Sequence, residues 1–330
     1  AGTAITTGDQ NVAVGYAALD ANTTASNNTG VGYLALGANT TGFSNTAFGS
    51  RSGDAITTGD YNTAVGNLAL SAETTGAQSV AIGHGALTSQ NSTGSADMFN
   101  TAVGASAGTA VTTGTYNTLI GGLAGDAITT GVRNTTMGYA SGGQLTTGSY
   151  NVALGMATLA ATTTQSNNTA VGYEALNQNT AANNTAVGYF ALNVNTTGSE
   201  STASGTYALA SNTTGASNVA MGYNSLGANT TAANNTAVGF RSLQANITGD
   251  TNTAVGKDSM KSNTTGTNNQ AFGTRSLDAN TTGASNVAVG DQALGANTTA
   301  SNNTAVGTSA LLANTTGADN VGLGAETLLG

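Results

Sequence analysis

The sequence predicts an all-β protein whose chain winds into a parallel β-solenoid (a β-roll) of 19 coils, each about 17 residues long. Three observations support this fold. The motif Asn-x-Ala-Val-Gly returns along the whole chain. Within a coil, one apolar position compensates for another, because a second position becomes apolar where the first is Gly. Bulky apolar residues are few, since aromatic residues make up 5% of the chain and much of the 38% hydrophobic content is Ala, which suits a thin core drawn out along a line.

The glycine that ends the motif marks the repeat, and we call it the marker glycine. It occurs 19 times, and successive marker glycines are 17 residues apart in all but two intervals. The interval from Gly83 to Gly104 is 21 residues, and that from Gly172 to Gly188 is 16. A period this short and steady indicates one coil per repeat. We therefore expect residues 1–330 to form a single solenoid domain, a segment of a longer fibre, with an insertion in an irregular coil near 88–100.

Each motif is expected to form a short strand, because β-branched residues alternate with small ones across it. The residue before the marker glycine is apolar in 18 of 19 repeats, Ser204 being the exception. We expect this residue, such as Val171 or Val187, to point into the core together with the Thr or Val two positions earlier. The Ala and the marker glycine would then lie on the outer face, where small residues leave room for close approach.

The residue four positions after the marker glycine is usually Leu, as at Leu176, and is also expected in the core. In four repeats this position is Gly, and the residue three positions later is then Ile, Val or Leu in place of the usual Asn. Close-packed interiors tolerate exchanges that preserve volume, so both positions are expected to face inward. The exchanged pairs are Gly53 with Ile56, Gly108 with Val111, Gly125 with Ile128, and Gly142 with Leu145.

Asn opens the motif in 17 of 19 repeats. Asn tolerates left-handed turn geometry and hydrogen-bonds to nearby backbone, and stacked Asn side chains can form a ladder. The segment Asn-Thr-Thr-Gly, as at Asn195–Gly198, predicts a second corner with a second ladder. The predicted structural ladder at the motif comprises Asn11, Asn28, Asn45, Asn62, Asn151, Asn168, Asn184, Asn218, Asn235 and Asn252.

Charged residues support the same register. Aligned coils place Arg241, Asp258 and Arg275 in one column and Lys261 and Asp278 in another, so that the sign of charge alternates from coil to coil. Each exposed pair contributes ~0.5 kcal/mol or less to stability. We expect these columns to disfavour slipped registers as much as to stabilise the native one.

Several classes of function are disfavoured by the composition. The net charge of −9 leaves no basic stripe for nucleic acid, and the absence of Cys excludes disulfides and thiolate metal sites. No apolar run is long enough to span a membrane. The one histidine, His84, directly follows a marker glycine and has no evident orienting partner for general-base chemistry. We predict no enzyme activity, no catalytic residues, no cofactor and no metal site.

Two surface columns are candidates for contacts. Aromatic residues that follow marker glycines on neighbouring coils would bind sugar faces or a neighbouring chain, or else cover the edge of the solenoid itself. Thr pairs at the Asn-Thr-Thr-Gly corner are candidate glycan carriers, although the repeat alone explains the nine Asn-Thr-Thr sequons at this corner. The candidate ligand or chain contacts are Tyr16, Tyr33, Tyr173, Tyr189, Tyr223 and Phe240. The candidate glycan-bearing residues are Thr23, Thr24, Thr213, Thr214, Thr281 and Thr282.

The motif, followed by Ala-Leu or Ser-Leu, resembles the head repeats of trimeric autotransporter adhesins and related repeats in phage tail-fibre-like proteins. The family motif Asn-Ser-x-Ala-Ile-Gly builds a left-handed parallel β-roll, usually as a homotrimer. The resemblance covers essentially all of the chain, although the Asn-Thr-Thr-Gly corner makes the period longer than the family's. It implies a left-handed coil and adhesion or surface-fibre work outside a cell, and it carries over no catalytic residues.

We therefore expect an extracellular or cell-surface segment (or a virion fibre) that forms a rigid, glycosylated rod and associates with itself laterally or end to end through exposed strand edges. Its expected partners are other copies of itself and cell-surface carbohydrate. One alternative is a carbohydrate- or receptor-binding tail-fibre module. A second is an ice-binding solenoid with regular Thr arrays, which is weakened because neighbouring Thr residues point to opposite sides.

Overall fold

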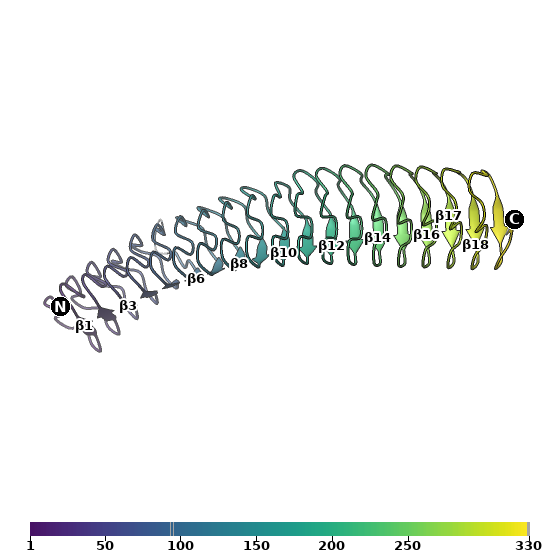
Figure 1. Cartoon of the computed structure of the whole chain (residues 1–330). Helices are drawn as coiled ribbons and strands as arrows, with labels where there is room; N and C mark the ends of the chain where they lie inside the picture. Colours follow the sequence, from purple (N-terminus) through teal and green to yellow (C-terminus); the bar gives the residue numbers. More distant parts are fainter. Residues whose placement is uncertain (93, 95, 329–330) are drawn as a thin grey trace. The chain divides into compact units, whose positions relative to one another are not determined.

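The computed structural model describes residues 1–92, 94 and 96–328, and over these residues the chain is an all-β solenoid with 19 three-residue strands and no helix (Figure 1). The prediction of a parallel β-solenoid is confirmed. Ser95, within the expected insertion at 88–100, lies outside the described residues. The chain divides into two compact units, Ala1–Asn167 and Asn168–Gly330, and each is described by itself.

In the first unit every strand pairs in parallel with the next strand along the chain, and equivalent residues of the motif lie opposite one another, as Ala64 does opposite Ala81. This in-register pairing gives one coil per repeat. The strands are β1 (Val12–Val14), β2 (Thr29–Val31), β3 (Thr46–Phe48), β4 (Thr63–Val65), β5 (Val80–Ile82), β6 (Thr101–Val103), β7 (Thr118–Ile120), β8 (Thr135–Met137) and β9 (Val152–Leu154).

The second unit repeats this arrangement, and its 16-residue coil keeps the register, since Val171 lies opposite Val187. Its strands are β10 (Thr169–Val171), β11 (Thr185–Val187), β12 (Thr202–Ser204), β13 (Val219–Met221), β14 (Thr236–Val238), β15 (Thr253–Val255), β16 (Gln270–Phe272), β17 (Val287–Val289), β18 (Thr304–Val306) and β19 (Val321–Leu323).

The strands present the opposite face to the core from the one predicted. The middle residue of every strand from β2 to β19 is buried, as at Ala186, whereas Val187 beside it is 40% exposed. The prediction that the residue before the marker glycine points inward, at Val171 and Val187, was wrong. The reason is lack of space where the turn carries Leu: at the middle position Gly30, an added Cβ would lie 3.2 Å from Cγ of Leu19, so there is room for little more than a methyl group. Where Gly replaces that Leu, the middle position holds the larger buried side chains of Leu119 and Thr136.

The marker glycines are required by close contact between successive coils, and not by an open outer face as predicted. Gly32 has φ of +139°, and a Cβ there would lie 2.3 Å from the carbonyl oxygen of Gly49, the marker glycine of the next coil. No side chain fits so close to a backbone atom, and L-residues rarely adopt this φ. The marker glycine is therefore a stacking contact between coils.

The core consists of the strand Ala, the Leu four positions after the marker glycine, and the exchanged apolar residues. Leu176 and Ile56 are completely buried. A Cβ on Gly53 would lie 3.0 Å from Cδ1 of Ile56, and one on Gly125 would lie 2.8 Å from Cδ1 of Ile128. At Gly53 and Gly125 the apolar residue therefore occupies space that Leu fills in other coils, as the predicted exchange of core volume requires. At Gly108 and Gly142 the nearest side chains are instead the middle strand residues Leu119 and Thr136.

Candidate functional site

The Asn residues that open the motif form a ladder in each unit. The backbone N–H of Asn45 donates to Oδ1 of Asn28 at 2.9 Å, and Nδ2 of Asn28 donates to the carbonyl oxygen of Gly42 at 2.8 Å. Nine of the ten predicted ladder residues are buried, and Asn11 is half-buried. Most of these amides are occupied by backbone groups, Nδ2 of Asn235 being buried without a partner, so the ladder holds coils together and is a structural element.

A second column lies at the residue seven positions after the marker glycine, which we call the corner column. In the second unit it is a continuous ladder in which each Asn side chain donates to the previous one, as Nδ2 of Asn212 does to Oδ1 of Asn195 at 2.8 Å. This column includes the Asn residues of the Asn-Thr-Thr sequons. The sequon Asn residues are buried, as at Asn212 and Asn22, except for the half-buried Asn314, so their amides are not accessible to a glycan in the folded coil.

The candidate glycan-bearing threonines divide into two kinds. In the second unit the first Thr of a pair is half-buried, and its hydroxyl donates to the next coil, from Thr213 to the carbonyl oxygen of Thr230 at 3.0 Å. Thr281 does the same toward Thr298. The second members, Thr214 and Thr282, are exposed, as are both Thr23 and Thr24 in the first unit. The exposed hydroxyls line one side of the corner.

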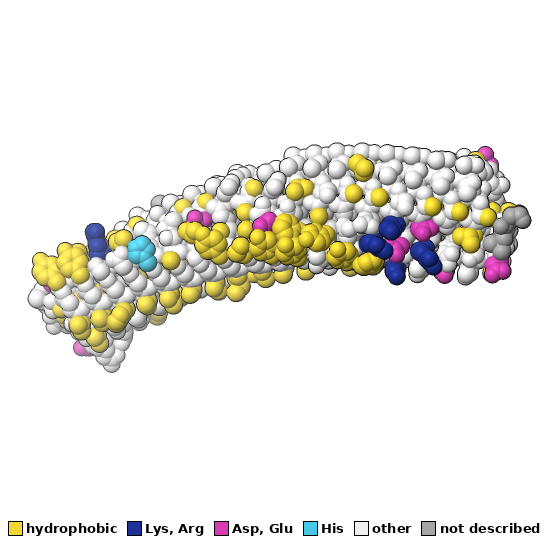
Figure 2. Space-filling view, viewed as in Figure 1, with side chains coloured by type: hydrophobic (Ala, Val, Ile, Leu, Met, Phe, Trp, Pro, Cys, Tyr) yellow, Lys and Arg dark blue, Asp and Glu magenta, His cyan; other side chains and the backbone are white. Residues whose placement is uncertain are grey.

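Six aromatic side chains of the second unit form a continuous surface, which we call the aromatic ridge. Tyr173 stacks on Tyr189 with centroids 5.4 Å apart, and Tyr223 stacks on Phe240 at the same distance. Tyr207 connects the two pairs edge to face. Figure 2 shows hydrophobic side chains gathered over β10–β12. The ridge comprises Tyr173, Tyr189, Phe190, Tyr207, Tyr223 and Phe240.

Sequence reasoning found four members of the ridge and missed Phe190 and Tyr207. Both lie two positions after a marker glycine, and only the position directly after it was followed. The Glu174 carboxylate accepts a hydrogen bond from the Tyr173 hydroxyl, and this bond and the negative charge of the carboxylate raise the pKa of Tyr173.

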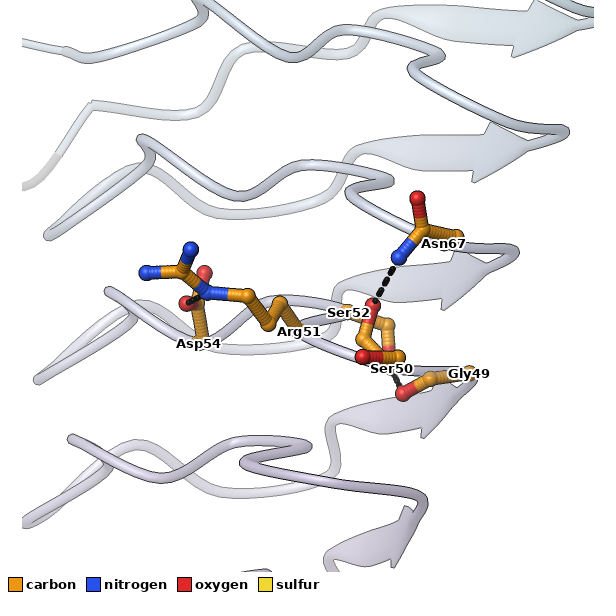
Figure 3. Close-up of polar contacts among 6 residues, drawn as sticks. All are labelled: Gly49, Ser50, Arg51, Ser52, Asp54 and Asn67. Atoms are coloured by element: carbon orange, nitrogen blue, oxygen red, sulfur yellow. Dashed lines mark hydrogen bonds and ion pairs between the residues drawn. The ribbon is translucent and has the colours of Figure 1, made fainter.

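In the first unit the corresponding column begins with the stacked pair Tyr16 and Tyr33, whose centroids are 5.5 Å apart. It then becomes polar at Ser50 and Asn67, and continues with exposed His84. Nδ2 of Asn67 donates to the carbonyl oxygen of Ser50 at 3.1 Å, which ties two coils together (Figure 3). The aromatic column is therefore interrupted in this unit.

The first unit also has an aromatic column that sequence reasoning missed, at the residue five positions before the marker glycine. The ring of Phe99 stacks on that of Tyr116 with centroids 5.2 Å apart. The guanidinium of Arg133 then lies between two rings of the same column, 5.1 Å from the centroid of Tyr116 and 5.5 Å from that of Tyr150. An alignment of coils at this position would have revealed the column from the sequence.

Charged residues of the second unit gather over β14–β16 (Figure 2). Arg241 donates twice to the Asp258 carboxylate of the next coil, at 2.9 and 3.3 Å, which confirms the predicted charge register at this pair. The same guanidinium lies 4.7 Å from the ring centroid of Phe240. Burial raises the pKa of Asp278, while the charge of Arg275 opposes this rise.

The described residues bring together no group of three or more His, Asp or Glu side chains that could hold a metal ion. Nor does any described segment form a helix long and apolar enough to cross a membrane. The site features of the chain are thus ladders, aromatic columns and one charged patch. Comparison with protein-family models, with curated proteins and with solved structures finds no match for this chain.

Proposed function

We propose that the chain is a segment of an extracellular or cell-surface structural fibre and that copies associate laterally. The observation that carries this proposal is the outer face of the strands. It presents an apolar side chain just before the marker glycine on coil after coil, including Phe48 at 57% exposure and Met221 at 46%. Exposed apolar surface of this extent is typical of an interaction site.

A second copy of the chain is the partner that fits this surface best. Exposed apolar residues recur once per coil, so they are spaced by the strand separation of ~4.8 Å. Another solenoid of the same repeat has the same spacing and meets every coil in register. Over a fibre, many coil-to-coil contacts of this kind would each bury one apolar side chain. Their contributions to the free energy of association would add up.

The test is the association state of the purified protein by sedimentation velocity over a range of concentrations. The variant Met221→Thr/Phe272→Thr/Val289→Thr keeps strand propensity while it removes apolar surface. At roughly 1 kcal/mol lost per side chain, we expect association to weaken by about 100-fold. The matched control Thr214→Ser/Thr282→Ser changes exposed corner residues and should leave association unchanged. A wild-type protein that stays monomeric at every concentration would contradict the proposal.

A second function, carbohydrate binding, is favoured by the aromatic ridge. Its aromatic side chains are partly exposed, and Tyr hydroxyls lie among them, so the ridge combines the apolar and polar contacts that a sugar needs. Glycan-array binding should be lost in Tyr173→Ala/Tyr189→Ala and retained in Tyr16→Ala/Tyr33→Ala, which removes a stacked pair of the first unit. Equal loss in both variants would contradict a site on the ridge.

A further inference from the structure

In the first unit, the aromatic column at the residue five positions before the marker glycine contains a hollow of ≈ 360 Å³. This hollow is lined by Tyr61, Gln78, Val80 and Phe99. Tyr61, Gln78 and Phe99 occupy the same position on three successive coils, each two residues before its strand and each with φ between +49° and +60°. The two rings are therefore separated by two strand spacings, ~9.6 Å. Gln78 belongs to the coil between them and is half-buried.

Farther along the same column the chain fills the equivalent space with one of its own side chains. Tyr116, Arg133 and Tyr150 repeat the arrangement of ring, middle residue and ring on three successive coils. The planar guanidinium lies against both rings, and Nη1 donates to the Tyr150 hydroxyl at 2.8 Å. Two rings two coils apart thus hold one guanidinium, through cation–π contact with each.

We propose that the hollow between Tyr61 and Phe99 binds the guanidinium of an arginine side chain presented by a partner protein. The residue on the coil between the two rings is here the uncharged Gln78. The space that the Arg133 guanidinium occupies between Tyr116 and Tyr150 is therefore available to a ligand in this hollow. Val80 closes one side of the hollow.

The charge around the hollow favours a cation over a neutral sugar. Asp60 directly precedes Tyr61, and Asp97, which is exposed, forms a β-bridge with Ala77 beside Gln78. The first unit has two basic side chains in its sequence, of which Arg51 binds Asp54 at 3.0 Å and Arg133 lies in its sandwich. Acidic residues thus neighbour the lining residues along the backbone, and the two arginines of this unit are already engaged, so its charge favours a cationic ligand.

The test exchanges the two middle residues. Binding of Nα-acetyl-arginine amide is followed by NMR titration, and we expect one site in the millimolar range. Gln78→Arg fills the hollow with the chain's own guanidinium and should abolish binding. Arg133→Gln opens a second hollow between Tyr116 and Tyr150 and should give two sites. Both substitutions replace exposed or half-exposed side chains, and circular dichroism verifies that each variant keeps its fold.

Two further ligands distinguish guanidinium recognition from its alternatives. Nα-acetyl-lysine amide has the same charge without the plane and should bind at least about threefold more weakly, since a planar cation contacts both rings. Methyl pyranosides test the hollow as a sugar site. The proposal is overturned if pyranosides bind and the arginine probe does not, if lysine and arginine bind equally, or if Gln78→Arg leaves arginine binding intact.

Discussion

The corner column is built differently in the two units. In the second unit it is Asn on every coil from Asn179 to Asn314, and each amide donates both to the previous Asn and to a carbonyl oxygen of its own corner, as Asn246 does to Asn229 at 3.0 Å and to Gly249 at 2.9 Å. In the first unit the residues of this column differ from coil to coil. They are Asn22, Asn39, Ile56, Glu73, Gln90, Val111, Ile128, Leu145 and Thr162.

The first unit shows what happens where unlike residues meet in this column. Asn39 precedes Ile56, which has no donor, and Oδ1 of Asn39 is buried without a hydrogen-bond partner. Glu73 and Gln90 instead satisfy each other, since Nε2 of Gln90 donates to the Glu73 carboxylate at 3.0 Å. Val111, Ile128 and Leu145 then form an apolar run. The comparison teaches that the column can be polar or apolar, and that a polar residue beside an apolar one can lose its partner, as Oδ1 of Asn39 does.

The largest effect is expected at Glu73, whose buried carboxylate replaces the ladder in the irregular part of the first unit. It accepts from the backbone N–H of Thr74, Thr75 and Gly76, the last at 2.7 Å, and from Ser92. Glu73→Ala would leave these donors buried and unpaired, and we expect a loss of about 3–5 kcal/mol in the free energy of unfolding. Urea denaturation measures it. A loss below about 1 kcal/mol would show that the carboxylate is dispensable.

A smaller loss is expected when the regular ladder of the second unit is broken. Asn246→Ala removes the donor to Asn229 and Gly249 and the acceptor of Asn263 Nδ2, so we expect about 2–3 kcal/mol. Thr265→Ala, at an exposed position one coil away, is the control and should change stability by less than about 0.5 kcal/mol. Equal effects of the two variants would mean that the ladder contributes little.

The smallest effect is expected when one coil of the first unit is given the Leu and Asn residues that the coils of the second unit carry at the same positions. Gly53→Leu alone crowds Ile56, and Ile56→Asn alone leaves a cavity, so each should destabilise by about 1–3 kcal/mol. The double variant restores the Leu–Asn coil and gives Oδ1 of Asn39 a donor. A double-mutant cycle should therefore show at least about 1 kcal/mol of favourable coupling. Additive losses would contradict the volume exchange.

Sequence reasoning could predict what depends on the period: the coil length, the buried Leu column and the exchange of Gly53 with Ile56. It could not predict which strand face is buried. Alternation fixes that Thr and Val share one face and Ala the other, and hydrophobicity favours Val inside. The deciding quantity is the space between the strand and the buried turn residues that face it, which fits a small residue such as Ala186 where those turns carry Leu.

The candidate surfaces were predicted in part for a similar reason. Aromatic residues were followed at one position of the repeat, which finds the pair Tyr173 and Tyr189. Side chains from adjacent positions, such as Tyr207, reach the same surface because the turn brings consecutive residues to neighbouring places. The Arg133 sandwich depends on the spacing of coils in space, which the linear order of residues does not display. Handedness and chain count stay predictions.

The two irregular intervals show where the coil accepts changes in length. The longer one leaves β5 and β6 in register, with Val80 opposite Thr101, and the shorter one leaves β10 and β11 in register. In the shorter coil the missing residue is absorbed at the corner, where the N–H of Ala181 reaches Oδ1 of Asn179 only two residues away. Foreign peptides inserted at the equivalent corner of successive coils would be displayed at the regular spacing of the coils, and the stacked marker glycines would stay undisturbed. The scaffold is therefore suited to multivalent display.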